Sequence, residues 1–145
     1  VAYLAGVPNM NVLETEWWTM ALPPEWWADA EEDSILIGDR DDVGCIEIST
    51  LHKEQGVFSP AEVREIANAE SGDDRAWRNV KPGDFTGVES AFIEEGAAIR
   101  EWYVSNGPML LFITYSCDEE NRGMDDSAVD ELLDTLLLRE EGAQS

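Results

Sequence analysis

The residue types that most often perform nucleophilic or metal chemistry are scarce in this chain, which has one histidine and two cysteines. His52 follows a strand-like run, and its neighbours Leu51 and Lys53 include no nucleophile. Nucleophilic catalysis needs a serine or cysteine beside a general base. Cys45 and Cys117 fall in apolar strand-like runs, where a thiol usually packs as a small buried hydrophobe. We therefore expect no catalytic residues.

The potential metal ligands also fail to form a recognisable site. A structural zinc site needs four cysteine or histidine ligands, and the whole chain has three such residues. The acidic segment 39–44 resembles the start of a calcium loop, but Val43 and Thr50 stand where that loop needs oxygen ligands. A hairpin turn rich in Asp and Gly explains the segment better. We expect neither a metal nor a cofactor.

The acidic residues are too numerous to single out a catalytic pair. The chain carries 32 acidic and 9 basic residues among 145, for a formal net charge of −23. Two carboxylates can perform acid–base catalysis, but close pairs arise by chance at this density. The charge repels nucleic acids and anionic membranes, so we expect neither as a partner. A saline habitat and a basic partner would both explain it.

The aromatic residues supply the candidates for partner binding. Six tryptophans are present, and Trp17 and Trp18 are adjacent, so in a strand their side chains face opposite sides. Trp102 shares a strand face with Arg100, which would be costly to bury without a partner. Tryptophan and arginine dominate the hot spots of protein interfaces. We predict Trp17, Arg100 and Trp102 as partner-binding residues, with the last two on an open sheet face.

Length and composition indicate one folded domain. A chain of 145 residues fits one domain, and its hydrophobic fraction of 43% argues against disorder. We expect a leader or partly disordered segment over 1–16, a single α+β domain over 17–139 and a frayed tail over 140–145. The sequence has neither a signal-peptide pattern nor an apolar run long enough to span a membrane. We expect a cytoplasmic protein.

Apolar alternation and turn residues predict the strands. The segment 17–23 alternates and ends at two prolines, and Trp26 and Trp27 follow in a predicted turn. A hairpin follows, and later three strands separated by two-residue turns predict a meander, whose last strand is apolar on both faces. The hairpin strands are 34–38 and 43–50, and the meander strands are 85–94, 97–105 and 109–117.

Two segments have the signals of helices. Ser59, Pro60 and Glu62 form a capping box, and Phe58 can pack against Val63, which predicts a helix over 60–70. The segment 126–138 carries an apolar stripe with helical spacing, made of Val129, Leu132, Leu133, Leu136 and Leu137. The resulting fold class is α+β: an antiparallel sheet of about six strands with two helices packed mainly on one face.

This order of elements resembles the PsbP-like superfamily. That superfamily includes an extrinsic photosystem II subunit, a nuclear import factor that binds the small GTPase Ran, and bacterial families of unknown function. The resemblance covers 17–138, and its features are an opening strand ending at Leu22-Pro23, then Pro24-Glu25-Trp26, a helix after Phe58-Ser59-Pro60, a meander containing 85–87 and 109–115, and a leucine-rich last helix. It implies the same architecture, and its members mostly bind other proteins.

The resemblance brings no functional residues to this chain, but it suggests a class of function. Some bacterial members are chaperones that shield apolar helices. Our leading hypothesis is a bacterial, non-catalytic protein-binding or chaperone-like accessory module that is a monomer or homodimer and has an unidentified protein partner. One alternative is an acidic inhibitor or immunity-type protein that neutralises a basic enzyme by charge complementarity. The other is an enzyme whose site the sequence does not reveal.

Overall fold

A computed structural model describes residues 3–7, 10–72 and 75–139. Its helices are α1 (Pro60–Ser71) and α2 (Asp126–Leu133), with a 3-10 turn, η1 (Glu119–Asn121). The N-terminal strands are β1 (Tyr3–Val7), β2 (Met10–Glu14) and β3 (Trp18–Leu22). They are followed by β4 (Trp26–Ala30), β5 (Ile35–Asp39), β6 (Gly44–His52), β7 (Arg78–Val80), β8 (Thr86–Glu94), β9 (Ala97–Asn106), β10 (Met109–Asp118) and β11 (Leu137–Leu138).

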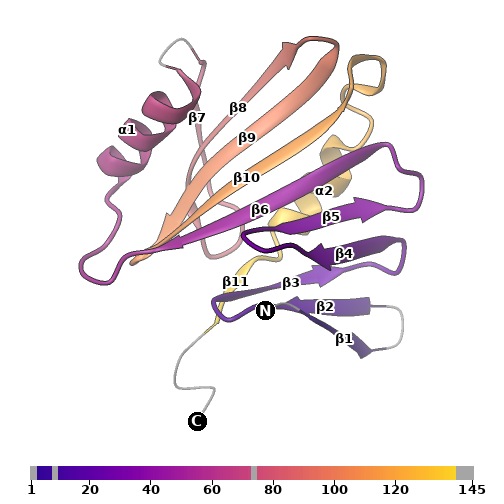
Figure 1. Cartoon of the computed structure of the whole chain (residues 1–145), viewed down its shortest axis with the longest axis horizontal. Coiled ribbons are helices and arrows are strands. Elements are labelled where there is room, and N and C mark those ends of the chain that lie inside the picture. Colours follow the sequence, from indigo (N-terminus) through magenta and orange to yellow (C-terminus); the bar gives the residue numbers. More distant parts are fainter. Residues whose placement is uncertain (1–2, 8–9, 73–74, 140–145) are drawn as a thin grey trace.

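The strands form two antiparallel sheets (Figure 1). The larger has the order β4-β5-β6-β10-β9-β8-β7, and the smaller has the order β1-β2-β3-β11. The predicted class, α+β with antiparallel strands and two helices, is confirmed, with more strands than the six expected. Neither helix within the described ranges is long and apolar enough to cross a membrane.

The predicted meander is the centre of the larger sheet. The pairings Glu94 with Ala97 and Asn106 with Met109 leave two-residue turns between β8, β9 and β10. Gly96 has a φ of 84°, and two-residue hairpin turns favour glycine because they require a positive φ. The predicted hairpin also forms, as β5 and β6, and β6 pairs with β10.

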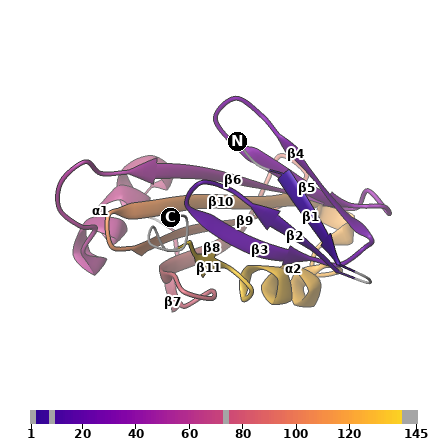
Figure 2. The same ribbon diagram turned by 90° about the horizontal axis from the view of Figure 1, so that it is seen from below.

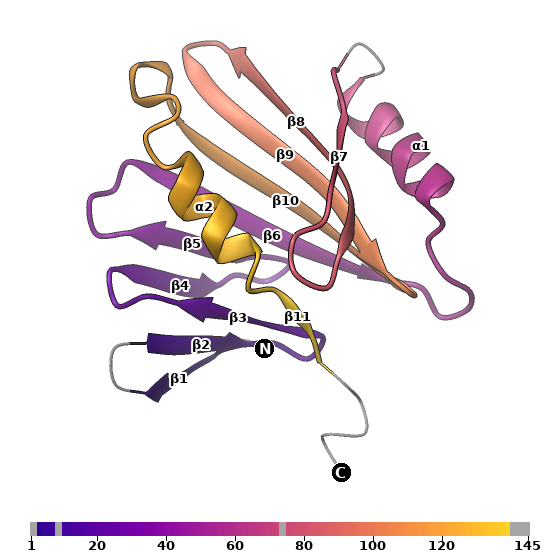
Figure 3. The same cartoon turned by 180° about the vertical axis from the view of Figure 1, so that it is seen from behind.

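Alternate residues of the central strands contact different helices. One set packs with α2 in the main core, which includes Trp102, Val104, Leu111 and Ile113 of the sheet and Val129, Leu132 and Leu133 of the helix. The other set packs with α1 in a second cluster, which includes Val88, Tyr103 and Leu110 of the sheet and Phe58, Val63 and Ala67 around the helix. Successive strand residues point to opposite faces, so the two helices cover opposite faces of the larger sheet. The helix α2 passes behind the strands in Figure 1 and in front of them in Figure 3.

This arrangement differs from the expectation that both helices pack mainly on one face. The physical reason is the strand β10, whose Leu111 and Ile113 are buried on one face and whose Leu110 is buried on the other. Each apolar face needs its own cover, because burying apolar surface is the main favourable term in folding. Figure 2 shows the consequence: α1 lies beside one end of the long strands, and α2 runs beneath the other end.

The first helix begins as its sequence predicts. The hydroxyl of Ser59 accepts a hydrogen bond from the backbone N–H of Glu62 at 3.1 Å, and Pro60 occupies the first turn. Phe58 and Val63 are buried in the same cluster. The carboxylate of Glu62 does not return to the cap, because it binds the ammonium of Lys53 at 2.7 Å.

The second helix is shorter than expected. It ends at Leu133, where the hydroxyl of Thr135 donates to the carbonyl of Leu132 at 2.6 Å and accepts from the N–H of Ala21 at 3.0 Å. A threonine hydroxyl that bonds a helix carbonyl competes with helix continuation. The chain then pairs with β3 as β11, which leaves Leu137 exposed rather than in the helical stripe.

Two N-terminal expectations are corrected. The segment expected as a leader over 1–16 contains the paired strands β1 and β2, and Leu13 of β2 is buried in the main core. Trp26 and Trp27 begin strand β4 rather than lying in a turn, because β4 pairs with β5 and Trp26 packs in the same core. The tail expected to fray, 140–145, lies outside the described residues.

Candidate functional site

Arg100 and Trp102, predicted on an open face, are both buried. They are 8% and 2% exposed, on the side of β9 that α2 covers. The prediction placed Arg100 on the open face because burial was expected to leave its charge without a partner. Carboxylates from β8 and α2 supply those partners, so burial does not leave the charge alone.

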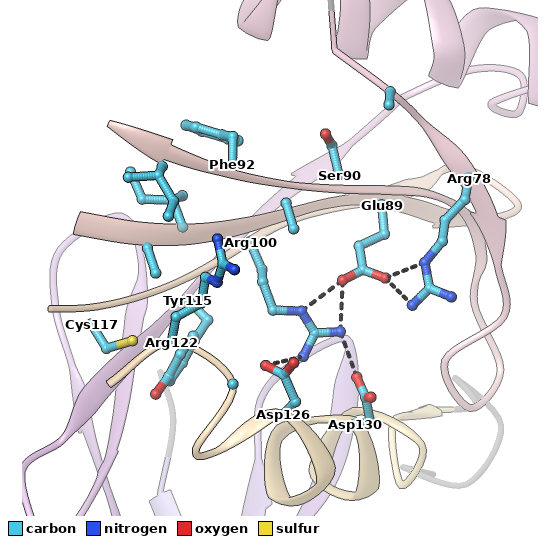
Figure 4. Close-up of a pocket in the computed structure, with 16 residues that line it drawn as sticks. Arg78, Glu89, Ser90, Phe92, Arg100, Tyr115, Cys117, Arg122, Asp126 and Asp130 are labelled. Carbon is cyan, nitrogen blue, oxygen red and sulfur yellow. Dashed lines mark hydrogen bonds and ion pairs between the residues drawn. The ribbon is translucent and has the colours of Figure 1, made fainter. Parts of the chain in front are cut away.

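The partners of Arg100 form a connected ion network (Figure 4). Its Nε and Nη2 atoms lie 2.7 and 2.6 Å from Oε2 of Glu89, and Nη2 also lies 2.7 Å from Oδ1 of Asp130. Nη1 is 3.6 Å from Oδ1 of Asp126. The other oxygen of Glu89 accepts from Nε of Arg78 at 2.9 Å. The network therefore ties α2 to strands β8 and β9.

The charge of Arg100 is fixed by this network. Burial lowers the pKa of its guanidinium, but the hydrogen bond to Asp130 and the charge of Glu89 outweigh burial and raise the pKa above its ordinary value. A guanidinium that stays protonated cannot act as a general base. The arrangement is suited to holding α2 in place rather than to moving a proton.

A cavity of about 500 Å³ opens beside the network, and Phe92, Cys117 and Arg122 contribute to its lining. In its wall the hydroxyl of Tyr115 donates to Oδ2 of Asp125 at 2.8 Å. Burial raises the pKa of Tyr115, and the hydrogen bond and charge of Asp125 raise it further. A phenol held in its protonated form is a structural donor here.

The cysteines are not paired with the histidine. Cys117 is opposite Gly44, Cys45 is opposite Ser116, and His52 is opposite Met109 at the other end of the same two strands. Seven to eight residues along a strand span about 25 Å, so no thiol–imidazole pair forms. Within the described ranges, no group of three or more His, Cys, Asp or Glu residues is placed to hold a metal ion.

Trp17, the third predicted binding residue, is half-buried at the junction of the two sheets. Its ring stacks on His52, with the ring centroids 4.5 Å apart. Both residues line a cleft of about 1030 Å³, together with Val57, which is 61% exposed. Trp17 is the member of the predicted set that the structure leaves near the surface.

A second hollow, which we call the α1 groove, lies on the sheet face opposite α2. It has a volume of about 580 Å³ between α1 and strands β6, β9 and β10. Leu51, at 56% exposed, lines it beside the half-buried residues Ile66 and Phe112. The remaining lining residues are Asp33, Ser49, Thr50, Glu70, Ser71, Glu101, Tyr103 and Leu110.

The floor of the α1 groove is held by aromatic contacts. Tyr103 stacks on Phe112 with centroids 4.8 Å apart and meets Trp77 edge to face at 5.6 Å. The hydroxyls of Tyr103 and Ser71 are 2.9 Å apart, and Trp77 donates to Asn68 of α1 at 3.0 Å. The groove therefore has a preformed apolar floor, which is typical of binding sites.

The sequence did not single out the α1 groove. Its one signal was the second apolar face of β10, which carries Leu110 and Phe112. That signal did not show that α1 would cover this face only in part, because α1 contacts β8 and β9 but leaves Leu51 on β6 exposed.

Comparisons with known proteins inform the fold. No protein-family model matches this chain, and no curated protein matches it. A crystal structure of a Bacteroides thetaiotaomicron VPI-5482 protein matches with a TM-score of 0.64 and 22% identity, over 87% of this chain and 46% of that one. The chain thus spans about half the length of the Bacteroides protein.

The solution structure of cyanobacterial PsbP (CyanoP) from Synechocystis sp. PCC 6803 also matches. Its TM-score is 0.48 at 11% identity, over 93% of this chain and 95% of that one. A PsbP is therefore among the solved structures that this chain matches. At these identities the similarities concern the fold and carry no argument about function.

Proposed function

We propose that this chain is a non-catalytic protein-binding module and that the α1 groove is its binding face. The observation that carries the proposal is Leu51, an exposed leucine beside Phe112 and Ile66 over a preformed apolar floor. An exposed apolar residue beside an apolar, concave surface is typical of interaction sites. A location in the cytoplasm and a monomeric or homodimeric state remain predictions.

The sites that favour other functions have weaker support. The Arg100 network ties elements of the fold together, and its arginine stays protonated. The cleft beside Trp17 retains the sequence-based proposal of a partner contact. In that cleft the ammonium of Lys53 is bound to Glu62, and a guanidinium nitrogen of Arg139 donates to the carbonyl of Thr15. The α1 groove has an exposed apolar anchor, Leu51, on a face of the larger sheet.

Selection of peptides from a random library displayed on phage tests the binding face. The bound site of a selected peptide is mapped by backbone amide chemical shifts of the labelled chain. We expect shifts on β6, β10 and α1, and we expect Leu51→Ser to weaken binding. The matched control is Leu137→Ser, because Leu137 has nearly the same exposure, 53%, on β11 in the other sheet.

The outcomes separate clearly. Shifts around the α1 groove with loss of affinity only in Leu51→Ser support the proposal. The proposal is contradicted if the peptides change the amide chemical shifts of α2 or of the Trp17 cleft instead. It is also contradicted if they bind equally to both leucine variants. Failure to select any peptide contradicts it as well, because a preformed apolar site binds short segments through its anchor pockets.

A further inference from the structure

The charge on the lining of the α1 groove is of one sign. The groove is lined by Asp33, Glu70 and Glu101, and no Lys, Arg or His is among its described lining residues. A concave surface with charges of one sign focuses the field and attracts groups of the opposite sign. Burial raises the pKa of Tyr103 in the floor, and the charges of Glu101 and Glu70 raise it further.

Glu101 is the carboxylate of this lining that has a buried oxygen without a hydrogen-bond donor among the described residues. It lies on β9, opposite Ser90 on β8 and Thr114 on β10. Its Oε1 atom is buried and has no hydrogen-bond partner among the described residues. A buried carboxylate oxygen without a donor is under-satisfied, so a cationic ligand that brings a donor to it gains a charge-assisted hydrogen bond.

We infer that the α1 groove takes a basic amphipathic segment of another protein. This inference rests on the proposed function and names the chemistry of its partner. An apolar side chain of the segment covers Leu51 and Phe112, and a lysine or arginine of the segment donates to Glu101. The net charge of −23 draws such a segment to the chain and strengthens the encounter at low salt.

Other occupants fit these observations less well. A second copy of the chain brings another charge of −23, and an anionic membrane surface is repelled for the same reason. A wholly apolar helix would cover Leu51 but would bury Glu101 without a partner, which costs free energy. A basic amphipathic segment satisfies both the apolar and the charged parts of the lining.

Calorimetric titration with one synthetic peptide tests the partner chemistry. The peptide is one of those selected on phage, and amide chemical shifts have shown that it binds the α1 groove. We expect this peptide to contain lysine or arginine. We expect Glu101→Gln to weaken its binding about tenfold to a hundredfold, as loss of a hydrogen bond to a charged group does. Glu94→Gln is the matched control, because it removes one exposed carboxylate from β8 outside the groove.

A peptide without basic residues, or equal affinities of the two variants, overturns the inference while the proposed function stands. Replacing the basic residue of the peptide with norleucine gives a second measurement. The norleucine peptide should bind the original chain much more weakly than the basic peptide does. With Glu101→Gln the two peptides should differ little, because the peptide change and the protein change remove the same contact. Additive losses would show that the cation binds elsewhere and would also overturn the inference. Absence of any groove-binding peptide would instead contradict the proposed function itself.

Discussion

The guanidinium of Arg100 lies over the ring of Trp102, with its Cζ atom 4.5 Å from the ring centroid. The two residues are two positions apart on β9 and therefore share a face. That face is the one covered by α2, where Trp102 is 2% exposed. The pair belongs to the core, and its contribution is to stability.

The first prediction concerns Trp102. Trp102→Ala should lower the free energy of unfolding by about 3–5 kcal/mol, because truncating a large buried aromatic side chain removes its packing and leaves a cavity. The measurement is the urea midpoint of the variant beside the original chain. Trp27→Ala is the control, since Trp27 is 39% exposed, and it should lose much less. Similar losses in both variants would contradict the core position of Trp102.

The second prediction concerns the ion network. Arg100→Met should cost about 3–5 kcal/mol, because it leaves Glu89 buried with fewer partners. The side chain of Glu89 is 4% exposed. Arg122→Met is the matched control: Arg122 is exposed, and its loss should change stability by about 0.5 kcal/mol or less. Denaturant unfolding measures both variants.

A double variant separates loss of the pair from loss of packing. Adding Glu89→Leu to Arg100→Met should recover part of the stability, because it removes the buried carboxylate that Arg100→Met leaves with fewer partners. Thermal unfolding of the single and double variants gives the comparison. A double variant less stable than Arg100→Met would mean that Glu89 is satisfied by Arg78 alone.

The strands were predictable where local signals determine them. Alternation in 18–22 and the glycines at 96 and 107 define β3 and the meander without information from the rest of the chain. Ser59 and Pro60 likewise fix the start of α1. The end of α2 was not predictable, because Thr135 bonds Ala21, which is 114 residues away in the sequence.

The candidate site was less predictable than the fold for the same reason. The burial of Arg100 depends on Glu89 and Asp130, which are 11 and 30 residues away. No periodic pattern in the sequence predicts that Arg100 contacts these two carboxylates. A lone arginine in a strand is expected at the surface. The α1 groove likewise depends on how far α1 extends across β6 and β10, which is a matter of tertiary packing.

The third prediction concerns salt. With a net charge of −23, repulsion among carboxylates opposes the compact state, and added salt screens it. The melting temperature should therefore rise between low ionic strength and a few hundred millimolar salt at neutral pH. Sodium and potassium chloride should act alike, since screening does not depend on the cation. A flat or falling trend would show that the carboxylates are already well separated or paired.

The last prediction concerns Asp39, which is 9% exposed and has an Oδ1 atom without a hydrogen-bond partner among the described residues. Burial raises its pKa above the ordinary 3.8, and the charges of Asp125 and Asp41 add to this, against hydrogen bonds from backbone N–H groups that lower it. Between 3.8 and the raised pKa the native state binds a proton that the unfolded chain has lost. Stability therefore falls as pH rises through this window.

Asp39→Asn should remove that loss while keeping an acceptor oxygen for the backbone. At neutral pH the variant should be more stable than the original chain, and the difference should disappear well below pH 3.8, where both states of Asp39 are protonated. Urea unfolding across the pH range measures this, with Asp29→Asn on the exposed part of β4 as the control. A variant less stable than the original chain at neutral pH would contradict this prediction. It would mean that the backbone hydrogen bonds in the turn after β5 stabilise the charged carboxylate more than burial and the acidic neighbours destabilise it.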